Sequence, residues 1–314
     1  MRSLLILSWT QVVKLLRRHL TWVLLVLLVV ILGMRINNIY RHAFDAPPQK
    51  VSPITILPED YGRAAILPGI FERARLSYDW LNLFVILLAT VSVGQEFTWG
   101  TMRTVLARGA GRTRLLIARF FALGAVAALY LLVLWVACGA FGILTTKSLA
   151  GQIDWSFLDA TFLVQEIAAL ARTWAITCPV IALALLVAVW TRNPGLSLTL
   201  TELTYGLDLL LAMFFGGAVG IYLAYVVEAG MDPRETGTGV WGTLATLLPH
   251  YNSAVVVHWG QPGKLSEMER AMLSMAEVLN LPRDPWRCMA LLLGYGIVAL
   301  ILGLLIFWRK DVTA

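Results

Sequence analysis

Residues 120–146 read FFALGAVAALYLLVLWVACGAFGILTT, and this stretch decides the fold. It contains no charged side chain, although Arg119 and Lys147 stand directly on either side of it. A helix needs about 20 apolar residues to cross the roughly 30 Å of hydrocarbon in a bilayer. The stretch is longer than that, so it predicts a transmembrane helix that crosses with some tilt.

Five further stretches are apolar and long enough to cross a membrane. The whole chain is 59% apolar and 14% charged, with a mean hydropathy of +0.75. A soluble domain has about 45–50% apolar and about 25% charged residues, so a water-soluble fold is excluded. We predict an all-α integral membrane protein, one transmembrane domain over residues 1–314, with six spans at 20–36, 80–94, 120–146, 157–190, 196–227 and 289–308.

The N-terminal residues 1–18 have the pattern of an amphipathic helix. Leu5, Trp9, Val12 and Leu16 follow a helical spacing, whereas Lys14 falls on another face. Such a helix lies in the interface with its apolar face toward the lipid, so we expect contact with membrane lipid here. A secretory signal peptide is the alternative, but the basic cluster follows a first apolar stretch and no cleavage pattern of small residues comes after it.

The distribution of Lys and Arg predicts the orientation. Both termini and the loop 95–119 carry a large excess of Lys and Arg, whereas the segments on the opposite side carry slightly more acidic than basic residues. Because short basic segments beside spans are retained in the cytoplasm, we expect a multi-pass protein of the cell membrane with both termini cytoplasmic. The same location explains the overall basic charge without nucleic-acid binding.

The first outer segment, residues 37–79, is rich in proline before Pro68. Proline favours extended backbone and removes hydrogen-bond donors, so we expect extended chain followed by a short helix near 69–77. A turn at 191–195 contains Asn193-Pro194-Gly195, which predicts that spans four and five form an antiparallel hairpin.

The second outer segment, residues 228–287, contains two candidate elements. Residues 239–248 are apolar but too few to span, and they stop at Pro249, so we expect a re-entrant or interfacial piece. Met268, Met272 and Met275 follow a helical spacing after a capping box, which predicts an outer amphipathic helix.

Signatures of catalysis and of metal binding are missing from the sequence. There is no Walker A motif, because the run Gly109-Ala110-Gly111-Arg112 lacks the lysine and a preceding strand. No zinc-protease or serine-hydrolase motif occurs, and the three cysteines and four histidines are scattered. We therefore expect no enzyme, no metal site and no cofactor in this chain, and any ATP must be bound by another chain.

The loop after the second span carries the most informative pattern. An acidic residue ends the span, a Gly-Thr pair follows, and a short segment then places apolar and basic residues on different faces. The order of these residues resembles that of the permease subunits of ABC-2 type ABC transporters. The matching positions are Glu96, Gly100, Thr101, Arg103, Leu106, Arg112 and Arg119, with Arg119 standing where lysine is more usual. Arg108, at the end of the same short segment, also belongs to the candidate site.

The resemblance implies that a cytoplasmic coupling helix near residues 100–108 seats in a partner ATPase. It further implies two copies of a cytoplasmic ABC ATPase that bind ATP and Mg, a second permease subunit in a homodimer or heterodimer, and export of a hydrophobic or amphipathic substrate. The alternatives are an ordinary positive-inside loop, a secondary transporter or channel without an ATPase, an intramembrane enzyme, and a scaffold.

Four charged residues fall inside the predicted spans: Glu166, Arg172, Glu202 and Asp208. A charge at the centre of a bilayer costs about 2.5–3.5 kcal/mol on insertion scales, so these side chains should face protein or water. Their depths in the hairpin favour the hypothesis that Arg172 pairs with Asp208, which leaves Glu202 for a cavity or a dimer interface. A purely structural ion pair and a substrate role both remain open for them.

Overall fold

The fold is taken from a computed structural model, which describes residues 2–45, 49–51, 54–56, 67, 69–71, 78–107, 111–153, 155–228, 246–258 and 284–309. Nearly all of this chain is helical. Its helices are α1 (Arg2–Leu16), α2 (His19–Asp45), α5 (Tyr78–Thr98), α6 (Thr101–Ala107), α7 (Arg112–Ala150), α8 (Ala160–Thr191), α9 (Pro194–Glu228), α12 (Pro249–His258) and α14 (Pro285–Arg309). A short antiparallel hairpin of β1 (Gln49–Val51) and β2 (Ile54–Ile56) follows α2.

Five helices are long and apolar enough to cross a membrane: His19–Asn38 in α2, Asp79–Thr98 in α5, and the whole of α7, α8 and α14. The chain is therefore a multi-pass helical membrane protein, and five of the predicted spans are confirmed. The sixth predicted span, residues 196–227, falls within α9, a helix of 35 residues whose side chains are described up to Leu211. Its crossing stays a prediction.

The spans show large apolar side chains on their outward faces. Leu132 and Val136 of α7 and Ile297 and Val298 of α14 are each more than half exposed. A continuous apolar surface of this kind would be unfavourable in water but is the ordinary lipid-facing surface of a membrane helix.

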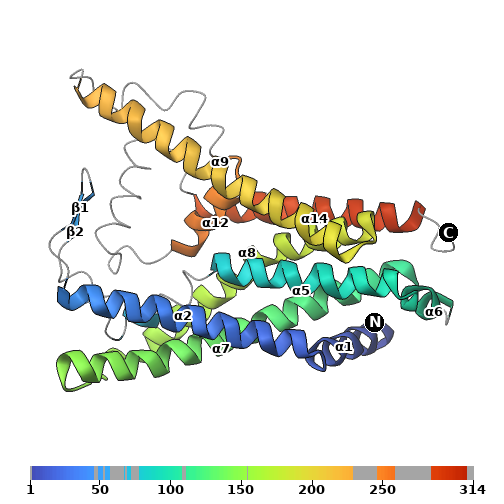
Figure 1. Cartoon of the computed structure of the whole chain (residues 1–314), viewed down its shortest axis with the longest axis horizontal. Helices are drawn as coiled ribbons and strands as arrows, with labels where there is room; N and C mark the ends of the chain where they lie inside the picture. The colour runs from blue at the N-terminus through green and yellow to red at the C-terminus, as the bar shows by residue number, and fades with distance from the viewer. Residues whose placement is uncertain are drawn as a thin grey trace.

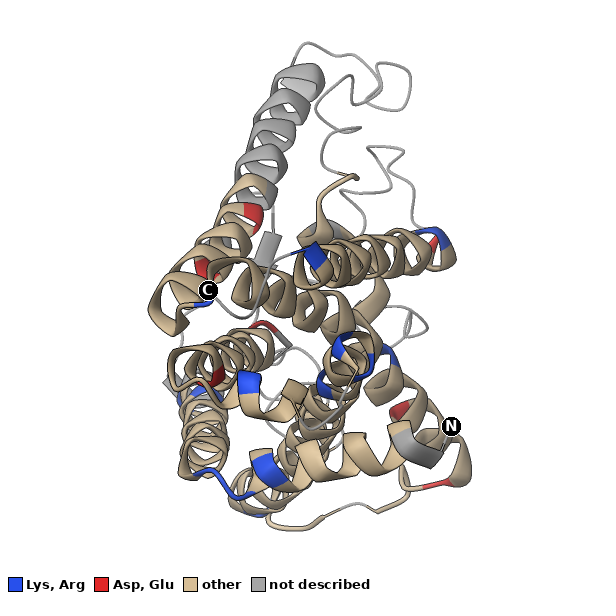
Figure 2. Cartoon of the chain, turned by 90° about the vertical axis from the view of Figure 1, so that its right-hand side faces the viewer, with Lys and Arg blue, Asp and Glu red and all other residues tan. Residues whose placement is uncertain are grey.

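The spans run side by side, and α9 diverges from the others at one end (Figure 1). The first residue of α1, the helix α6 and the last turn of α14 all lie at the opposite end. Figure 2 looks at this end and shows α1 lying across it. An even number of crossings between the start of α1 and the end of α14 would fit this arrangement, with α9 as the sixth span.

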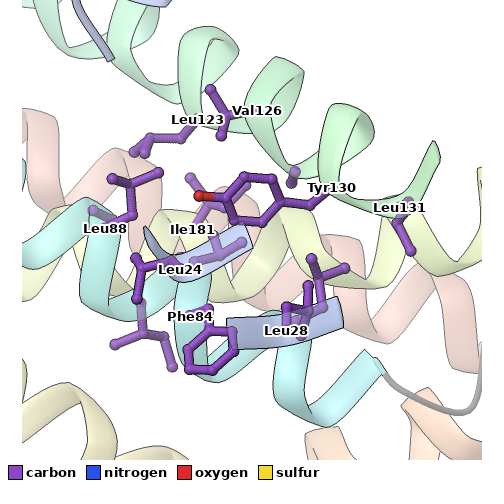
Figure 3. Close-up of a cluster of buried hydrophobic side chains, with 14 of the residues drawn as sticks. Leu24, Leu28, Phe84, Leu88, Leu123, Val126, Tyr130, Leu131 and Ile181 are labelled. Carbon is purple, nitrogen blue, oxygen red and sulfur yellow. The ribbon is translucent and has the colours of Figure 1, made fainter. Parts of the chain in front are cut away.

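A continuous apolar core joins α2, α5, α7 and α8 (Figure 3). Its centre is Tyr130 of α7, which is fully buried among Leu24, Leu28, Phe84 and other apolar side chains. The Tyr130 hydroxyl donates a hydrogen bond to the main-chain oxygen of Thr21 at 2.6 Å. A buried phenol needs such a partner, so this bond fixes the height of α2 against α7.

The predicted hairpin between spans four and five has the expected turn. Arg192 ends α8 with a left-handed backbone (φ 55°), and the Asn193 side chain accepts a hydrogen bond from the N–H of Leu196 at 3.1 Å. Pro194 takes the first position of α9, where its missing N–H costs nothing. This turn packs against Gly94 of α5 so closely that a Cβ atom there would lie 2.5 Å from the Pro194 Cα.

The helices extend beyond the predicted limits at both membrane borders. α2 continues to Asp45, past the predicted end of the span at 36, and α7 begins at Arg112 rather than near 120. Hydropathy marks only the residues in hydrocarbon, whereas helical hydrogen bonding continues into the interface. The polar ends of these two helices were therefore missed as helix.

In the outer segments the outcome is mixed. The strands of the β1–β2 hairpin agree with the extended chain expected in 37–79, whereas residues 37–45 continue α2 as helix. α12 begins at Pro249, where the apolar stretch was expected to stop. Proline at a first helical position starts a helix as readily as it ends one. Residues 69–71 are helical, but the rest of the short helix expected at 69–77, most of the 239–248 piece and the amphipathic helix after Ser266 lie outside the described residues.

The contact between Gly94 and Pro194 predicts a specific packing defect. Substitution Gly94→Ala places a methyl group against backbone atoms that cannot rotate away, and overpacking of this kind costs about 1–3 kcal/mol. The matched control is Gly294→Ala in α14, where the new Cβ would meet no described atom within 4 Å. We expect a lower midpoint of thermal unfolding in detergent for Gly94→Ala only; equal midpoints for the two variants would contradict the close packing.

Candidate functional site

One carboxylate holds three helices together at the end of the bundle seen in Figure 2. Glu96, in the last turn of α5, is only 5% exposed. Its Oε1 lies 2.6 Å from the Lys14 Nζ of α1 and 3.9 Å from the Arg18 guanidinium, and its Oε2 pairs with the Arg119 guanidinium of α7. We call these four residues the charge cluster.

The charge cluster has more cations than anions, and part of it is buried. Arg119 is as buried as Glu96, and one of its nitrogens also donates toward the Met102 sulfur at 3.8 Å. Arg18 is half-buried and donates to the Gln95 side-chain oxygen at 3.3 Å. Because the single carboxylate is shared among three basic groups, positive charge remains in excess here.

The excess positive charge changes the ionisation of Lys14. Burial, and then repulsion by Arg119 and by Arg18, lowers the pKa of Lys14 from 10.5 to about 8. Burial also lowers the pKa of Arg18. The amine of Lys14 thus loses its proton closer to neutral pH than an ordinary lysine does.

The short helix α6 is anchored to the charge cluster. Gly100 takes a positive φ of 68° and turns the chain out of α5, and the Thr101 hydroxyl donates to the Glu96 main-chain oxygen at 3.3 Å. Met102 is 2% exposed and lies against Arg119. Leu106 is half-buried against the apolar core. The helix is thereby fixed through one face.

The other face of α6 is open. Arg103, Thr104 and Ala107 are exposed in the described structure, and Trp99 just before the helix is 66% exposed. Arg108 lies outside the described residues. The described residues of α6 therefore have one face fixed to the bundle and one face accessible.

Further contacts tie this loop to the last span. The Arg112 guanidinium donates to the main-chain oxygens of Phe307 and Trp308 at 3.4 and 3.1 Å, near the C-terminus of α14, where a cation is favourable. Phe97 packs edge-to-face on Phe307, and the Arg192 guanidinium lies 5.8 Å above the Phe97 ring. The loop therefore contacts α14 and the α8–α9 turn as well as α1, α5 and α7.

Most of the residues predicted for ATPase coupling are placed by the structure. Glu96, Thr101 and Arg112 make contacts within the chain, Gly100 forms the turn between α5 and α6, and Arg103 lies on the exposed face of α6. Sequence reasoning missed Lys14, Arg18 and Met102 as members of the same site. The spacing of four residues between Lys14 and Arg18 puts both on one face of a helix turn and was the available signal.

Of the charged residues inside the spans, Glu166 is buried in α8 and Glu202 is half-buried in α9. The Asp208 carboxylate accepts a hydrogen bond from the His250 N–H at 2.9 Å, in the first turn of α12. A carboxylate at a helix N-terminus stabilises that helix, so Asp208 holds α12 against α9. The pairing of Arg172 with Asp208 stays a hypothesis.

Comparison with models of known protein families and with curated proteins finds no match to this chain. Within the described part of the chain, no group of three His, Cys, Asp or Glu side chains is placed to hold a metal ion. The function is therefore argued from the geometry of the bundle and of its charged end.

Removing the buried carboxylate should destabilise the bundle. Glu96→Gln leaves the buried Arg119 guanidinium uncompensated, and breaking a buried ion pair in this way costs about 3–5 kcal/mol. The double variant Glu96→Gln/Arg119→Met removes both charges, so its thermal unfolding midpoint in detergent should recover toward wild type. An additive loss in the double variant would show that the two residues do not act as a pair.

The depressed pKa of Lys14 gives a pH prediction. Since the folded chain releases this proton near pH 8 and the unfolded chain near 10.5, the contribution of Lys14 to stability rises between these two pH values. Reductive ¹³C-methylation followed by NMR titration should find one lysine dimethylamine with a pKa near 8, in addition to the N-terminal amine, which titrates in the same range. Arg18→Gln should move the pKa upward, whereas Arg17→Gln, at the exposed neighbouring residue, should not; equal responses would refute the assignment.

Proposed function

We propose that this chain is the membrane-spanning subunit of an ATP-driven exporter of the ABC-2 type. The observation that supports the proposal is the way in which α6 is attached to the bundle. One face of this short helix is buried against the charge cluster, and the other face is exposed. Met102 and Thr101 connect α6 to Arg119 and Glu96, and these connect onward to Lys14. Force applied to α6 would thus reach α1, α5 and α7 together.

The physical reason for efficient transmission is the cost of breaking the charge cluster. Separating a buried ion pair costs several kcal/mol, so a push of smaller energy moves the connected helices as a body. An ATPase that closes on ATP and Mg would bias the spans between inward-open and outward-open arrangements, provided that α6 contacts it differently in the two states. This is the role of a coupling helix.

The remaining parts of the proposal follow from the same geometry. α1, α6 and the end of α14 share the side that the positive-inside rule assigns to the cytoplasm, where the ATPase would bind. Two ATPase subunits would require two coupling helices, and hence a second permease subunit, identical or related. Lys14 and Arg17, whose side chains are exposed at this border, suit contact with anionic lipid head groups.

The test compares two basic residues on the same side of the membrane. The chain is co-expressed with the Walker A ATPases of neighbouring reading frames, purified in detergent and assayed for bound ATPase and ATP turnover. Arg103→Glu reverses a charge on the exposed face of α6, and Arg114→Glu reverses one on the exposed face of α7. We expect Arg103→Glu to lower complex formation or coupled turnover at least tenfold and Arg114→Glu to leave both near wild type.

Two outcomes would count against the exporter proposal. One is that no ATPase co-purifies with the folded wild-type chain, which would favour a secondary transporter or channel over an exporter subunit. The other is that Arg103→Glu and Arg114→Glu have equal effects, which would reduce α6 to an ordinary basic loop.

A further inference from the structure

A cavity of about 210 Å³ lies between α5, α8, α9, α12 and α14, on the side of the bundle away from α6. Most of its wall is apolar and includes Ile176, Val180 and Leu292. Polar side chains also line it, and these are Asn82, Thr204, Tyr205, Asp208, His250, Ser253 and Tyr295. An apolar chamber with a few convergent polar groups is the usual form of a small-molecule site.

Hydrogen bonds orient the side chains of Asn82 and Tyr205 and leave the Asn82 side-chain oxygen without a partner in the described structure. The Asn82 amide nitrogen donates to the Tyr205 oxygen at 3.2 Å, and the Tyr205 hydroxyl donates to Asp79 Oδ1 at 2.8 Å. This direction of donation fixes the orientation of the Asn82 amide. Asn82 is 2% exposed and its Oδ1 has no hydrogen-bond partner in the described structure.

A buried acceptor without a partner costs about 1–3 kcal/mol, so its presence needs a physical reason. Asp208 has the same feature, because its Oδ2 accepts from the His250 N–H while its Oδ1 is buried without a hydrogen-bond partner. Both oxygens belong to residues that line the one cavity. A ligand that donates hydrogen bonds would satisfy them.

The negative charge around the cavity favours a ligand whose hydrogen-bond donor is positively charged. The carboxylate of Asp208 lines the cavity, and that of Asp79 lies behind Tyr205, 3.8 Å from the His250 Nδ1. None of the described residues lining the cavity is Lys or Arg. An ammonium group offers three donors and a positive charge, so it matches the two unpartnered acceptors, one of which is a carboxylate oxygen, better than a hydroxyl does.

We propose that this cavity binds a small amphipathic ammonium compound, with its apolar body against Ile176, Val180 and Leu292 and its ammonium on Asp208 Oδ1 and Asn82 Oδ1. The volume is below the about 300–1,000 Å³ typical of drug-sized ligands, so one aromatic ring or a short alkyl chain fits. The binding follows from the cavity alone. That the ligand is exported cargo rests on the proposed function, and it narrows the substrate class to organic cations.

The test uses the purified chain in zwitterionic phosphatidylcholine nanodiscs, without any ATPase. Binding of 2-phenylethylamine, the neutral 2-phenylethanol and the anionic 3-phenylpropionate is measured by calorimetry, with empty nanodiscs subtracted. We expect the amine to bind at least tenfold more tightly than the alcohol and the carboxylate not to bind. Equal affinities for the amine and the alcohol would overturn the proposal.

Single substitutions test whether the amine binds in this cavity. Asp208→Asn removes the charge but keeps an oxygen that can accept from the His250 N–H, so α12 stays capped. The matched control is Glu202→Gln, which removes a charge from the same helix but does not line the cavity. We expect Asp208→Asn and Asn82→Leu to weaken amine binding at least tenfold, and Glu202→Gln to leave it unchanged.

A substitution that fills the cavity tests the site without changing a polar residue, in case the polar substitutions disturb folding. Ala299→Phe adds a ring to the cavity wall without changing any charge, and it should abolish binding of the amine. Amine binding that survives Ala299→Phe, or that responds equally to Asp208→Asn and Glu202→Gln, refutes this site. Because no ATPase is present, such a result would leave the coupling role of α6 intact, and failure of an ATPase to co-purify would leave the cavity result intact.

Discussion

The buried carboxylate of Glu96 is the constraint on which the end of this bundle that carries α1 and α6 depends. A buried carboxylate needs cationic partners, and here they are Lys14 of α1, Arg18 in the turn between α1 and α2, and Arg119 of α7. Those contacts place α1 across the end of the bundle and fix α5 against α7. Through Met102 they also hold α6 in place. The apolar core around Tyr130 supplies most of the buried surface, but apolar contacts alone would leave the heights of the helices undetermined.

Hydropathy was sufficient to predict the class of fold and the position of most spans, because the cost of a charge in hydrocarbon is large compared with any local preference. It could not predict where helices end, as α7 shows by starting at Arg112. Nor could it predict α12, since Pro249 is compatible with both the end and the start of a helix. The Asn193-Pro194 turn was predictable because its residues have strong conformational preferences.

Part of the candidate site could be predicted from the sequence. Gly100-Thr101 and Glu96 form a local pattern that sequence reasoning could recognise, and the structure gives each of them a contact or a backbone role. Lys14 and Arg18 lie far away in the sequence, so only the folded chain shows that they share the same carboxylate. The cavity proposed to bind an amine is formed by residues of five helices, α5, α8, α9, α12 and α14. No short sequence pattern predicts that these residues come together.

The order of the charge cluster along the chain has a consequence for biogenesis. All four of its residues, Lys14, Arg18, Glu96 and Arg119, lie in the first 119 residues. Tyr130 comes shortly after them, and its acceptor Thr21 lies shortly after Arg18. Helices leave the ribosome in sequence order, so α1, α2, α5 and the start of α7 can reach their mutual positions while α8 is still being synthesised. The contacts that hold these four helices therefore need no residue of a later span.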